Sequence, residues 1–324
     1  MSLIKPSRLR RTVAIRNLVR ETRLSIDNLS RPIFVTYRNK CLEIESIPGQ
    51  FHYPLDVIEK TIEGSIKLGI NGIILFGIPR SKDEIGTDTI CENGIIQKAV
   101  KKIRGSFPEL IIVTDVCFCQ YTTHGHCGIL NHNGDIDKIS SLKQVQKQAL
   151  SHADAGVDFV APSCRIDGMV QHIREALDSN GFEDSGILSY AVKYGSAFYG
   201  PFRDAVDSSP KDGDRKTYQM DPGNIREALK EAHLDEAEGA DIIMVKPALP
   251  YLDVIKEIKN QISCPVAAYQ VSGEYAMIKA AAQNRWIDED KAMLESILGI
   301  KRAGADIIIT YFADAAARLI ARKL

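Results

Sequence analysis

The sequence predicts an α/β fold, a (β/α)₈ TIM barrel preceded by an extended N-terminal arm. A recurring pattern supports this prediction: a helical stretch ends at a Gly-containing turn, and a short run of β-branched residues follows, as at 154–163 (DAGVDFVAPS), 238–248 and 303–312. The glycine suits a helix C-cap, and the apolar run suits a strand that is buried on both faces of a parallel sheet. Eight alternating pairs of strand and helix most simply close into a barrel.

Strands and helices alternate along the chain. Candidate strands lie at 33–37, 72–78, 110–117, 158–162, 187–194, 241–247, 265–271 and 306–311. Helical patterns lie at 56–68, 93–104, 140–155, 168–179, 224–238, 252–261, 274–284 and 288–302, and a closing helix lies at 313–322. Such alternation implies βαβ units. An open doubly wound sheet is the alternative, but it normally has fewer strands, and no G-x-G-x-x-G follows the first strand.

Composition and charge are those of an ordinary globular protein. The 324 residues are 44% hydrophobic and 26% charged, with a net charge of −1. No global field therefore attracts nucleic acid or a membrane, and no apolar run approaches the roughly 18 residues of a membrane helix. The seven cysteines are an odd set, and the N-terminus has no signal-peptide core. We therefore expect reduced thiols and a cytoplasmic location.

Two segments stand apart from the repeating pattern. Residues 1–30 carry a basic cluster before the barrel, which we assign to 31–324. This cluster fits a transit peptide or an arm for subunit contacts, and we favour the arm because the segment is not Ser-rich. Residues 199–223 are rich in Gly, Pro, Asp and Ser and follow a strand. We expect a lid there, on the face of the barrel where active sites lie.

Two lysines stand near the C-terminal ends of predicted strands: Lys193 in ILSYAVKY and Lys246 in DIIMVKPA. Burial disfavours the ammonium, and a second cation nearby disfavours it further. Both effects favour the neutral amine that attacks a ketone or aldehyde to form an imine. The alternative is that each lysine pairs with a carboxylate at the rim of the barrel.

The segment 115–128, DVCFCQYTTHGHCG, carries a candidate metal site. Cys117 and Cys119 would project to the same side of a strand, and the loop can return Cys127 to them. Three thiolates suit zinc and leave a fourth position open for water or substrate. His124 or His126 could fill that position and make the site structural. Buried cysteines without metal are the remaining alternative.

Other polar residues fall at the same end of the barrel. The carboxylate of Asp115 could act as acid or base, or simply cap a loop. Arg203 and Arg215 lie in the proposed lid, where guanidinium groups could bind a carboxylate. Ser272 and Tyr311 follow the last two strands, where a hydroxyl could hold a substrate carboxylate; for Ser272, a helix cap is the alternative. The residues thus indicate an imine-forming barrel enzyme with a metal and an anionic ketone or aldehyde substrate.

Six segments resemble the porphobilinogen synthase (5-aminolevulinate dehydratase) family, in chain order and over nearly the whole sequence: RLRR, DVCFCQYTTHGHCG, SYAVKYGSAFYGPFRDA, MVKPALPYLD, YQVSGEYAM and ITYFA. The resemblance implies a hydro-lyase of tetrapyrrole (heme) biosynthesis. Such an enzyme condenses two molecules of 5-aminolevulinate to porphobilinogen, with loss of two waters, through lysine Schiff bases assisted by zinc. It also implies a homo-oligomer, mostly an octamer, in which the arms wrap neighbouring barrels.

The resemblance also implies roles for single residues. Lys246 resembles the lysine that holds the first-bound substrate, and Lys193 the lysine that holds the second. The zinc-binding positions of the zinc-dependent members are matched by Cys117, Cys119 and Cys127. Substrate-carboxylate positions are matched by Arg203, Arg215, Ser272 and Tyr311, and more weakly by Gln219. Further active-site segments contain Asp115, Ser163 and Tyr199.

An allosteric magnesium ion is a further feature of some family members. Glu231 resembles its carboxylate ligand, and the alternative for this residue is an exposed helical charge. Many members have an aspartate after the sequence APS, whereas this chain has Cys164. That departure puts stimulation by magnesium in doubt.

Two other functions compete with the synthase. A class I aldolase on the same barrel would also form a lysine imine but would need no zinc. A metal-binding scaffold protein would use the metal only to hold the loop at 115–128.

Overall fold

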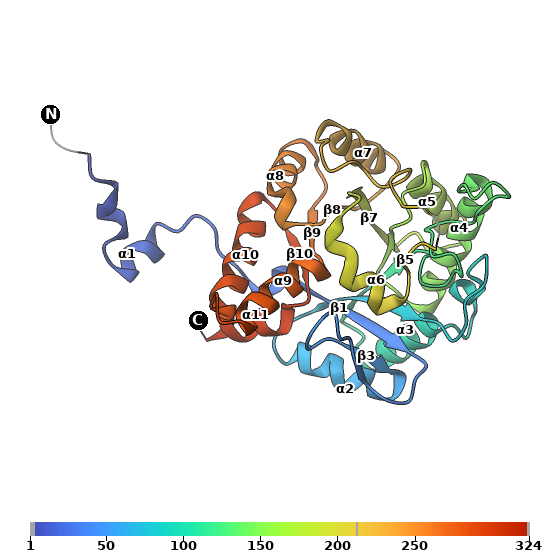
Figure 1. The fold of residues 1–324 in the computed structure, drawn as a ribbon, viewed down its shortest axis with the longest axis horizontal. Coiled ribbons are helices and arrows are strands. Elements are labelled where there is room, and N and C mark those ends of the chain that lie inside the picture. The colour runs from blue at the N-terminus through green and yellow to red at the C-terminus, as the bar shows by residue number, and fades with distance from the viewer. Residues whose placement is uncertain (1–3, 212, 323–324) are drawn as a thin grey trace.

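Eight parallel strands form a closed barrel in the computed structural model, which describes residues 4–211 and 213–322 (Figure 1). The barrel strands are β1 (Leu29–Thr36), β4 (Gly72–Ile78), β5 (Ile111–Val116), β6 (Phe159–Pro162), β7 (Gly186–Lys193), β8 (Ile242–Lys246), β9 (Val266–Gln270) and β10 (Ile307–Thr310). Each pairs with the next, and β10 pairs with β1 through Leu29 and Ile308. The predicted (β/α)₈ barrel is confirmed.

Helices connect the strands and cover the outside of the barrel (Figure 1). They are α2 (Leu55–Ile66), α3 (Ile95–Ser106), α4 (Lys138–Ala155), α5 (Met169–Ser179), α7 (Arg226–Ala237), α8 (Leu252–Gln261), α9 (Ser272–Gln283), α10 (Glu289–Ala303) and α11 (Ala313–Ala321). All nine were predicted, with ends that differ by no more than two residues.

Several shorter elements were not predicted. Strands β2 (Leu42–Glu43) and β3 (Phe51–Pro54) extend the sheet beyond β1. Helix α1 (Val13–Leu18) lies in the arm, and α6 (Gly200–Val206) occupies the start of the predicted lid. Short 3₁₀ turns complete the fold: η1 (Pro6–Arg10), η2 (Ile26–Asn28), η3 (Thr87–Ile90), η4 (Ala197–Tyr199) and η5 (Leu249–Tyr251).

The glycines of the recurring pattern end their helices as expected. Gly156 and Gly304 are the C-cap residues of α4 and α10, with φ of 101° and 128°, and Gly239 follows α7 with φ of 101°. A side chain is disfavoured at these angles. A Cβ on Gly304 would also approach the side chain of Lys259 to 2.8 Å. These turns return the chain from each helix to the next strand.

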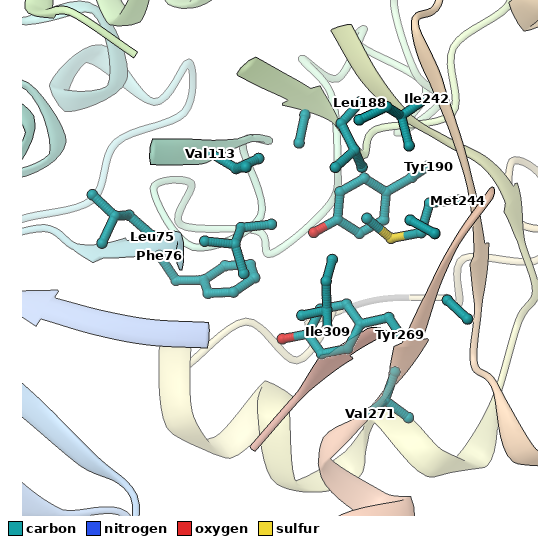
Figure 2. Close-up of a cluster of buried hydrophobic side chains, with 14 of the residues drawn as sticks. Leu75, Phe76, Val113, Leu188, Tyr190, Ile242, Met244, Tyr269, Val271 and Ile309 are labelled. Carbon is teal, nitrogen blue, oxygen red and sulfur yellow. The ribbon is translucent and has the colours of Figure 1, made fainter. Parts of the chain in front are cut away.

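The interior of the barrel is a packed apolar layer. Figure 2 shows part of this layer, including Leu75, Val113, Leu188 and Ile309. Tyr190 of β7 and Tyr269 of β9 lie within the same cluster, and neither is more than 1% exposed. The layer excludes water from beneath the C-terminal ends of the strands, where a site would form.

The arm extends away from the barrel (Figure 1). It carries large apolar side chains in exposed positions, among them Ile4 at 87% and Leu18 at 82% exposure. Strand β1 begins at Leu29, so the barrel starts two residues before the predicted boundary. Among the helices in the described ranges, none has the length and apolar character needed to cross a membrane.

Candidate active site

The two lysines predicted to react stand side by side. Lys193 ends β7 and Lys246 ends β8, and the two residues are partners in the parallel ladder. Each is 6% exposed. Both ammonium nitrogens lie over the ring of Tyr190, at 5.5 Å for Lys193 and 4.8 Å for Lys246. The sequence analysis missed Tyr190, whose ring forms the floor beneath both amines.

An irregularity in β7 explains why Tyr190 was missed. Strict alternation would place residues 190 and 193 on opposite faces of the strand. The register between β7 and β8 shifts between Ser189 and Val192, so that three steps along β7 match two along β8. This shift brings Lys193 to the same side as Tyr190.

Aromatic rings surround the amine of Lys246. Its Nζ lies 4.5 Å from the ring centre of Tyr269, 5.3 Å from that of Phe202 and 5.5 Å from that of Tyr199. Burial, followed by the charge of Lys193, lowers the pKa of Lys246 to about 7. Near neutral pH a large fraction of this amine is therefore uncharged and nucleophilic.

Lys193 does not share the lowered pKa of Lys246. Its Nζ donates a hydrogen bond of 2.6 Å to the backbone carbonyl of Ser163. Burial acts to lower the pKa of Lys193, but the neighbouring Cys127 and Cys117 outweigh it and raise the pKa above its usual value. Lys193 therefore departs from the expectation of two neutral amines, because Cys127, a thiol of a different loop with a lowered pKa, supplies negative charge that the strand pattern does not reveal.

The three cysteines predicted to bind metal form one cluster. Their sulfur atoms lie within 4.8 Å of one another, and those of Cys117 and Cys119 are 3.5 Å apart. The other two thiols donate to Cys127 and hold its pKa well below the usual range of a cysteine. Strand β5 ends at Val116, so a turn after the strand, rather than strand alternation, brings Cys117 and Cys119 together.

The donors of this cluster fit zinc. Over residues 4–211 and 213–322, it is the only group of three or more side chains positioned to hold a metal ion. Three buried thiols suit a soft or borderline cation. The two histidines of the loop bond elsewhere: His124 Nε2 lies 3.1 Å from the carbonyl of Glu84, and His126 Nδ1 lies 3.1 Å from the hydroxyl of Tyr218.

A small cavity of about 20 Å³ joins the lysines to the cysteines. It is lined by Asp115, Cys117, Cys119, Ser163, Lys193, Tyr199, Phe202, Arg215 and Lys246. Burial raises the pKa of Asp115, while the charges of the two lysines oppose that rise. Pockets for small ligands usually measure about 300–1,000 Å³. The cavity is therefore smaller than an ordinary ligand pocket, and Tyr199, Phe202 and Arg215 of the segment 199–223 are among the residues that close it.

Two arginines of the segment 199–223 have unused hydrogen-bond capacity, and one of them, Arg215, lines the cavity. Arg203 lies on α6, and Arg215 lies in the loop that follows. The Nε atoms of both are buried and have no hydrogen-bond partner, and the amide of Gln219 is in the same state. Buried donors without partners are costly, and a bound carboxylate would satisfy them. The geometry therefore favours an anion at this position.

Ser272 and Tyr311 lie beside the lid and do not line the cavity. Ser272 begins α9, and its hydroxyl accepts a 2.9 Å hydrogen bond from the backbone N–H of Phe202. The hydroxyl of Tyr311 accepts from the hydroxyl of Tyr269 at 3.1 Å. Tyr269 and Phe202 each contact the amine of Lys246, so Tyr311 and Ser272 are each one contact away from Lys246.

Glu231 lies outside the barrel, on α7. Its carboxylate is paired with the guanidinium of Arg165, which also binds Asp235 at 2.9 Å. The side chain of Arg165 is 8% exposed, and that of Glu231 is 27% exposed. This acid is therefore already paired with a cation of the chain itself, and its expected role as a magnesium ligand stays a prediction.

Comparison with known proteins supports one family. The family model described as delta-aminolevulinic acid dehydratase matches residues 3–319. The chain is 53% identical to the delta-aminolevulinic acid dehydratase of Halalkalibacterium halodurans, over 96% of this chain and 95% of that protein. It is 50% identical to the Bacillus subtilis enzyme of the same name, over 97% of each chain.

A solved structure agrees with these relatives. The crystal structure of delta-aminolevulinic acid dehydratase (porphobilinogen synthase) from Toxoplasma gondii, in complex with the reaction product porphobilinogen, superposes with a TM-score of 0.97 at 40% identity. The match covers 100% of this chain and 93% of that one.

Proposed function

The chain belongs to the delta-aminolevulinic acid dehydratase family, and from this we propose that it condenses two molecules of 5-aminolevulinate to porphobilinogen, with loss of two waters, in tetrapyrrole biosynthesis. The arrangement of Lys193 and Lys246 as ladder partners beside three thiols is the observation that carries the proposal. The substrate has a ketone, an amine and a carboxylate, and the site offers a counterpart for each.

Lys246 is the first nucleophile. Its amine, with a pKa of about 7, attacks the ketone carbon of one substrate and forms an imine with release of water. The surrounding rings of Tyr190, Tyr269 and Phe202 exclude bulk water, which protects this imine from hydrolysis.

Lys193 holds the second substrate as an imine after it gives up a proton, because its raised pKa keeps it protonated in the free site. The two lysine imines fix two identical molecules in different orientations, which turns an intermolecular condensation into an effectively intramolecular one. Asp115 is buried beside both amines and can accept and return the protons that these steps move. The new bonds between the two substrates displace both lysines, so that two waters are lost in total.

We propose zinc as the metal and Cys117, Cys119 and Cys127 as its ligands. When bound, zinc supplies Lewis acidity for the amine of the second substrate. The three sulfurs are the only protein donors grouped there in the described ranges, so the chain leaves a coordination position for a non-protein ligand. A class I aldolase would have no use for such a cluster.

Arg203 and Arg215 bind a substrate carboxylate, and Ser272 and Tyr311 hold the other. Residues 199–223 act as the lid, because both arginines and the cavity-lining Phe202 belong to this segment. Closing the lid brings the arginine charges to the substrate and covers the imines at the same time.

The arm serves subunit contacts in a homo-oligomer, for which we propose an octamer. Its apolar side chains Ile4, Leu9, Val13 and Leu18 are all more than half exposed in the single chain. Burial of such side chains against a neighbouring barrel would stabilise an assembly. Mass measurement in solution, before and after removal of residues 1–28, tests this assignment.

Trapping with borohydride tests the function directly. Reduction in the presence of 5-aminolevulinate converts an imine into a stable amine, and peptide mass spectrometry identifies the lysine that carries it. We expect the substrate to be attached to Lys246. The Lys246→Met variant should show neither the attached substrate nor turnover. Lys256→Met, which changes an exposed lysine of α8, is the matched control. Full turnover in Lys246→Met would refute the mechanism.

A further inference from the structure

Arg165 occupies an unusual position just after β6. Its φ of 62° lies in the left-handed region that side chains other than glycine rarely adopt. The surrounding structure must therefore hold this residue in place. The guanidinium provides that hold, because it binds both Glu231 and Asp235 of α7 and is almost fully buried.

The two carboxylates need a cation. Glu231 and Asp235 stand four residues apart on one helix, where like charges repel. Asp235 is 6% exposed, and further acids act on the same region, namely Asp167, Glu227 and Glu238. Lys138 pairs with Asp167 at 2.5 Å, which leaves Arg165 as the cation paired with Glu231 and Asp235 among the described ion pairs.

The same guanidinium connects to the reacting lysine by two routes. Along the chain, Arg165 follows Ser163 by two residues, and the carbonyl of Ser163 accepts the hydrogen bond from Lys193. Through space, Asp235 also accepts a hydrogen bond from Ser189, which lies on β7 where the register shift begins. Arg165 therefore ties together the loop after β6, helix α7 and the strand that carries Lys193.

We propose that Arg165 is a built-in cation that takes the place of a divalent ion at Glu231 and Asp235 and positions Ser163 for Lys193. Magnesium prefers an octahedral set of oxygens and binds through one or two carboxylates and several waters. Here the guanidinium binds one oxygen of each acid and so occupies the place between them that a divalent ion would take. The positioning role, but not the cation role, rests on the proposed function.

Three variants separate the roles. Arg165→Met removes the charge, and Arg165→Lys keeps it. Arg174→Met is the matched control for the loss of an anchoring guanidinium, since Arg174 binds Asp178 and the carbonyls of Phe182 and Ser185. We measure kcat, KM, magnesium binding by calorimetry and Tm, each with magnesium chloride and with sodium chloride at equal ionic strength. The calorimetric and thermal readouts require no activity.

For the wild-type protein we expect no magnesium binding and no difference in Tm or kcat between the two salts. Arg165→Met should lose up to about 100-fold in kcat with little change in KM, since misplacement of a reacting group has effects of this size. Magnesium chloride, but not sodium chloride, should also raise the Tm of Arg165→Met, because Glu231 and Asp235 become available to bind the ion. Arg165→Lys should recover part of the lost kcat.

Glu231→Gln keeps the ion pair between Arg165 and Asp235. This variant tests the proposal even if Arg165→Met does not fold. We expect this variant to match the wild type in showing no response to magnesium. The proposal that Arg165 replaces a divalent ion would be overturned if the wild type bound one magnesium ion per chain and Glu231→Gln abolished that binding. An Arg165→Met protein with the kcat of Arg174→Met would overturn the positioning role.

Discussion

The guanidinium groups of Arg203 and Arg215 lie close enough to oppose each other's charge. Burial, followed by the charge of Arg215, lowers the pKa of Arg203. Each group also has a buried Nε atom without a partner. Two neighbouring like charges, each with a buried spare donor, form a site prepared for an anion, because a bound carboxylate relieves both costs.

Removal of either arginine should therefore weaken substrate binding. We expect Arg203→Met and Arg215→Met each to lower kcat/KM by roughly 10- to 1,000-fold, the equivalent of one lost charge-assisted hydrogen bond of about 1.5–3 kcal/mol or somewhat more. Lys216→Met is the control, because this lid cation is 81% exposed. Steady-state kinetics measures the change, and equal losses in all three variants would contradict the carboxylate role.

The pKa of Lys246 predicts a pH dependence of both activity and stability. Below about pH 7 the amine is protonated, so kcat/KM should fall along an acid limb with a midpoint near that value. The pKa of Lys246 in the folded protein lies below 10.5, the usual value for a lysine, so the unfolded chain binds more protons between these two values. The contribution of Lys246 to the free energy of unfolding therefore increases as pH rises across that window.

Lys246→Met should consequently be inactive and more stable. Replacement of a buried, partly charged amine by an apolar side chain of similar length should raise the free energy of unfolding at neutral pH by on the order of a few kcal/mol. Urea unfolding below and within the window measures this change. An identical pH slope in the wild type and in Lys246→Met would contradict the assignment.

Glu274 holds the segment that follows Lys246. Its buried carboxylate accepts 2.5 Å hydrogen bonds from the backbone N–H groups of Leu249 and Val271, at the ends of two neighbouring strands. An amide cannot replace an acceptor-only group there, because its NH₂ would face a donor. We expect Glu274→Gln to lose about 1–3 kcal/mol of stability and part of kcat. Glu295→Gln, on the exposed side of α10, should change neither, and an unaltered melting curve for Glu274→Gln would refute this role.

We expect the three clustered cysteines to bind zinc and the neighbouring Cys164 not to bind it. Cys164 is buried against Cys117 but lies outside the group of three sulfurs. We expect Cys117→Ser to lose bound zinc and nearly all turnover, and Cys164→Ala to keep one zinc per active chain. Elemental analysis of dialysed protein measures both. Chelation should abolish wild-type activity, and added zinc should restore it; turnover that survives complete zinc removal would refute a catalytic zinc.

Most of the fold could be predicted because the barrel strands are apolar runs bounded by helix-ending glycines. The misses have local causes. Helix α6 begins at Gly200 and Pro201, which resemble a loop in the sequence, although proline is well tolerated in the first turn of a helix. Strands β2 and β3 have only two and four residues, too few for a pattern.

The site was harder to predict wherever one element depends on another. Tyr190 joins Lys193 only through the register shift of β7. The raised pKa of Lys193 depends on thiols from the loop after β5, and the pairing of Glu231 depends on Arg165 from the loop after β6. Strand alternation and spacing describe one element at a time, so such contacts between elements require coordinates.

The hydrogen bond from Phe202 to Ser272 has a kinetic consequence. Phe202 covers the cavity, and its backbone N–H is fastened to the hydroxyl at the start of α9. Each turnover admits two substrate molecules and releases one product, and the cavity measures only about 20 Å³. We therefore expect the hydrogen bond between Phe202 and Ser272 to break and re-form in every cycle. On the proposed function, loss of the Ser272 hydroxyl should therefore change the rate of product release.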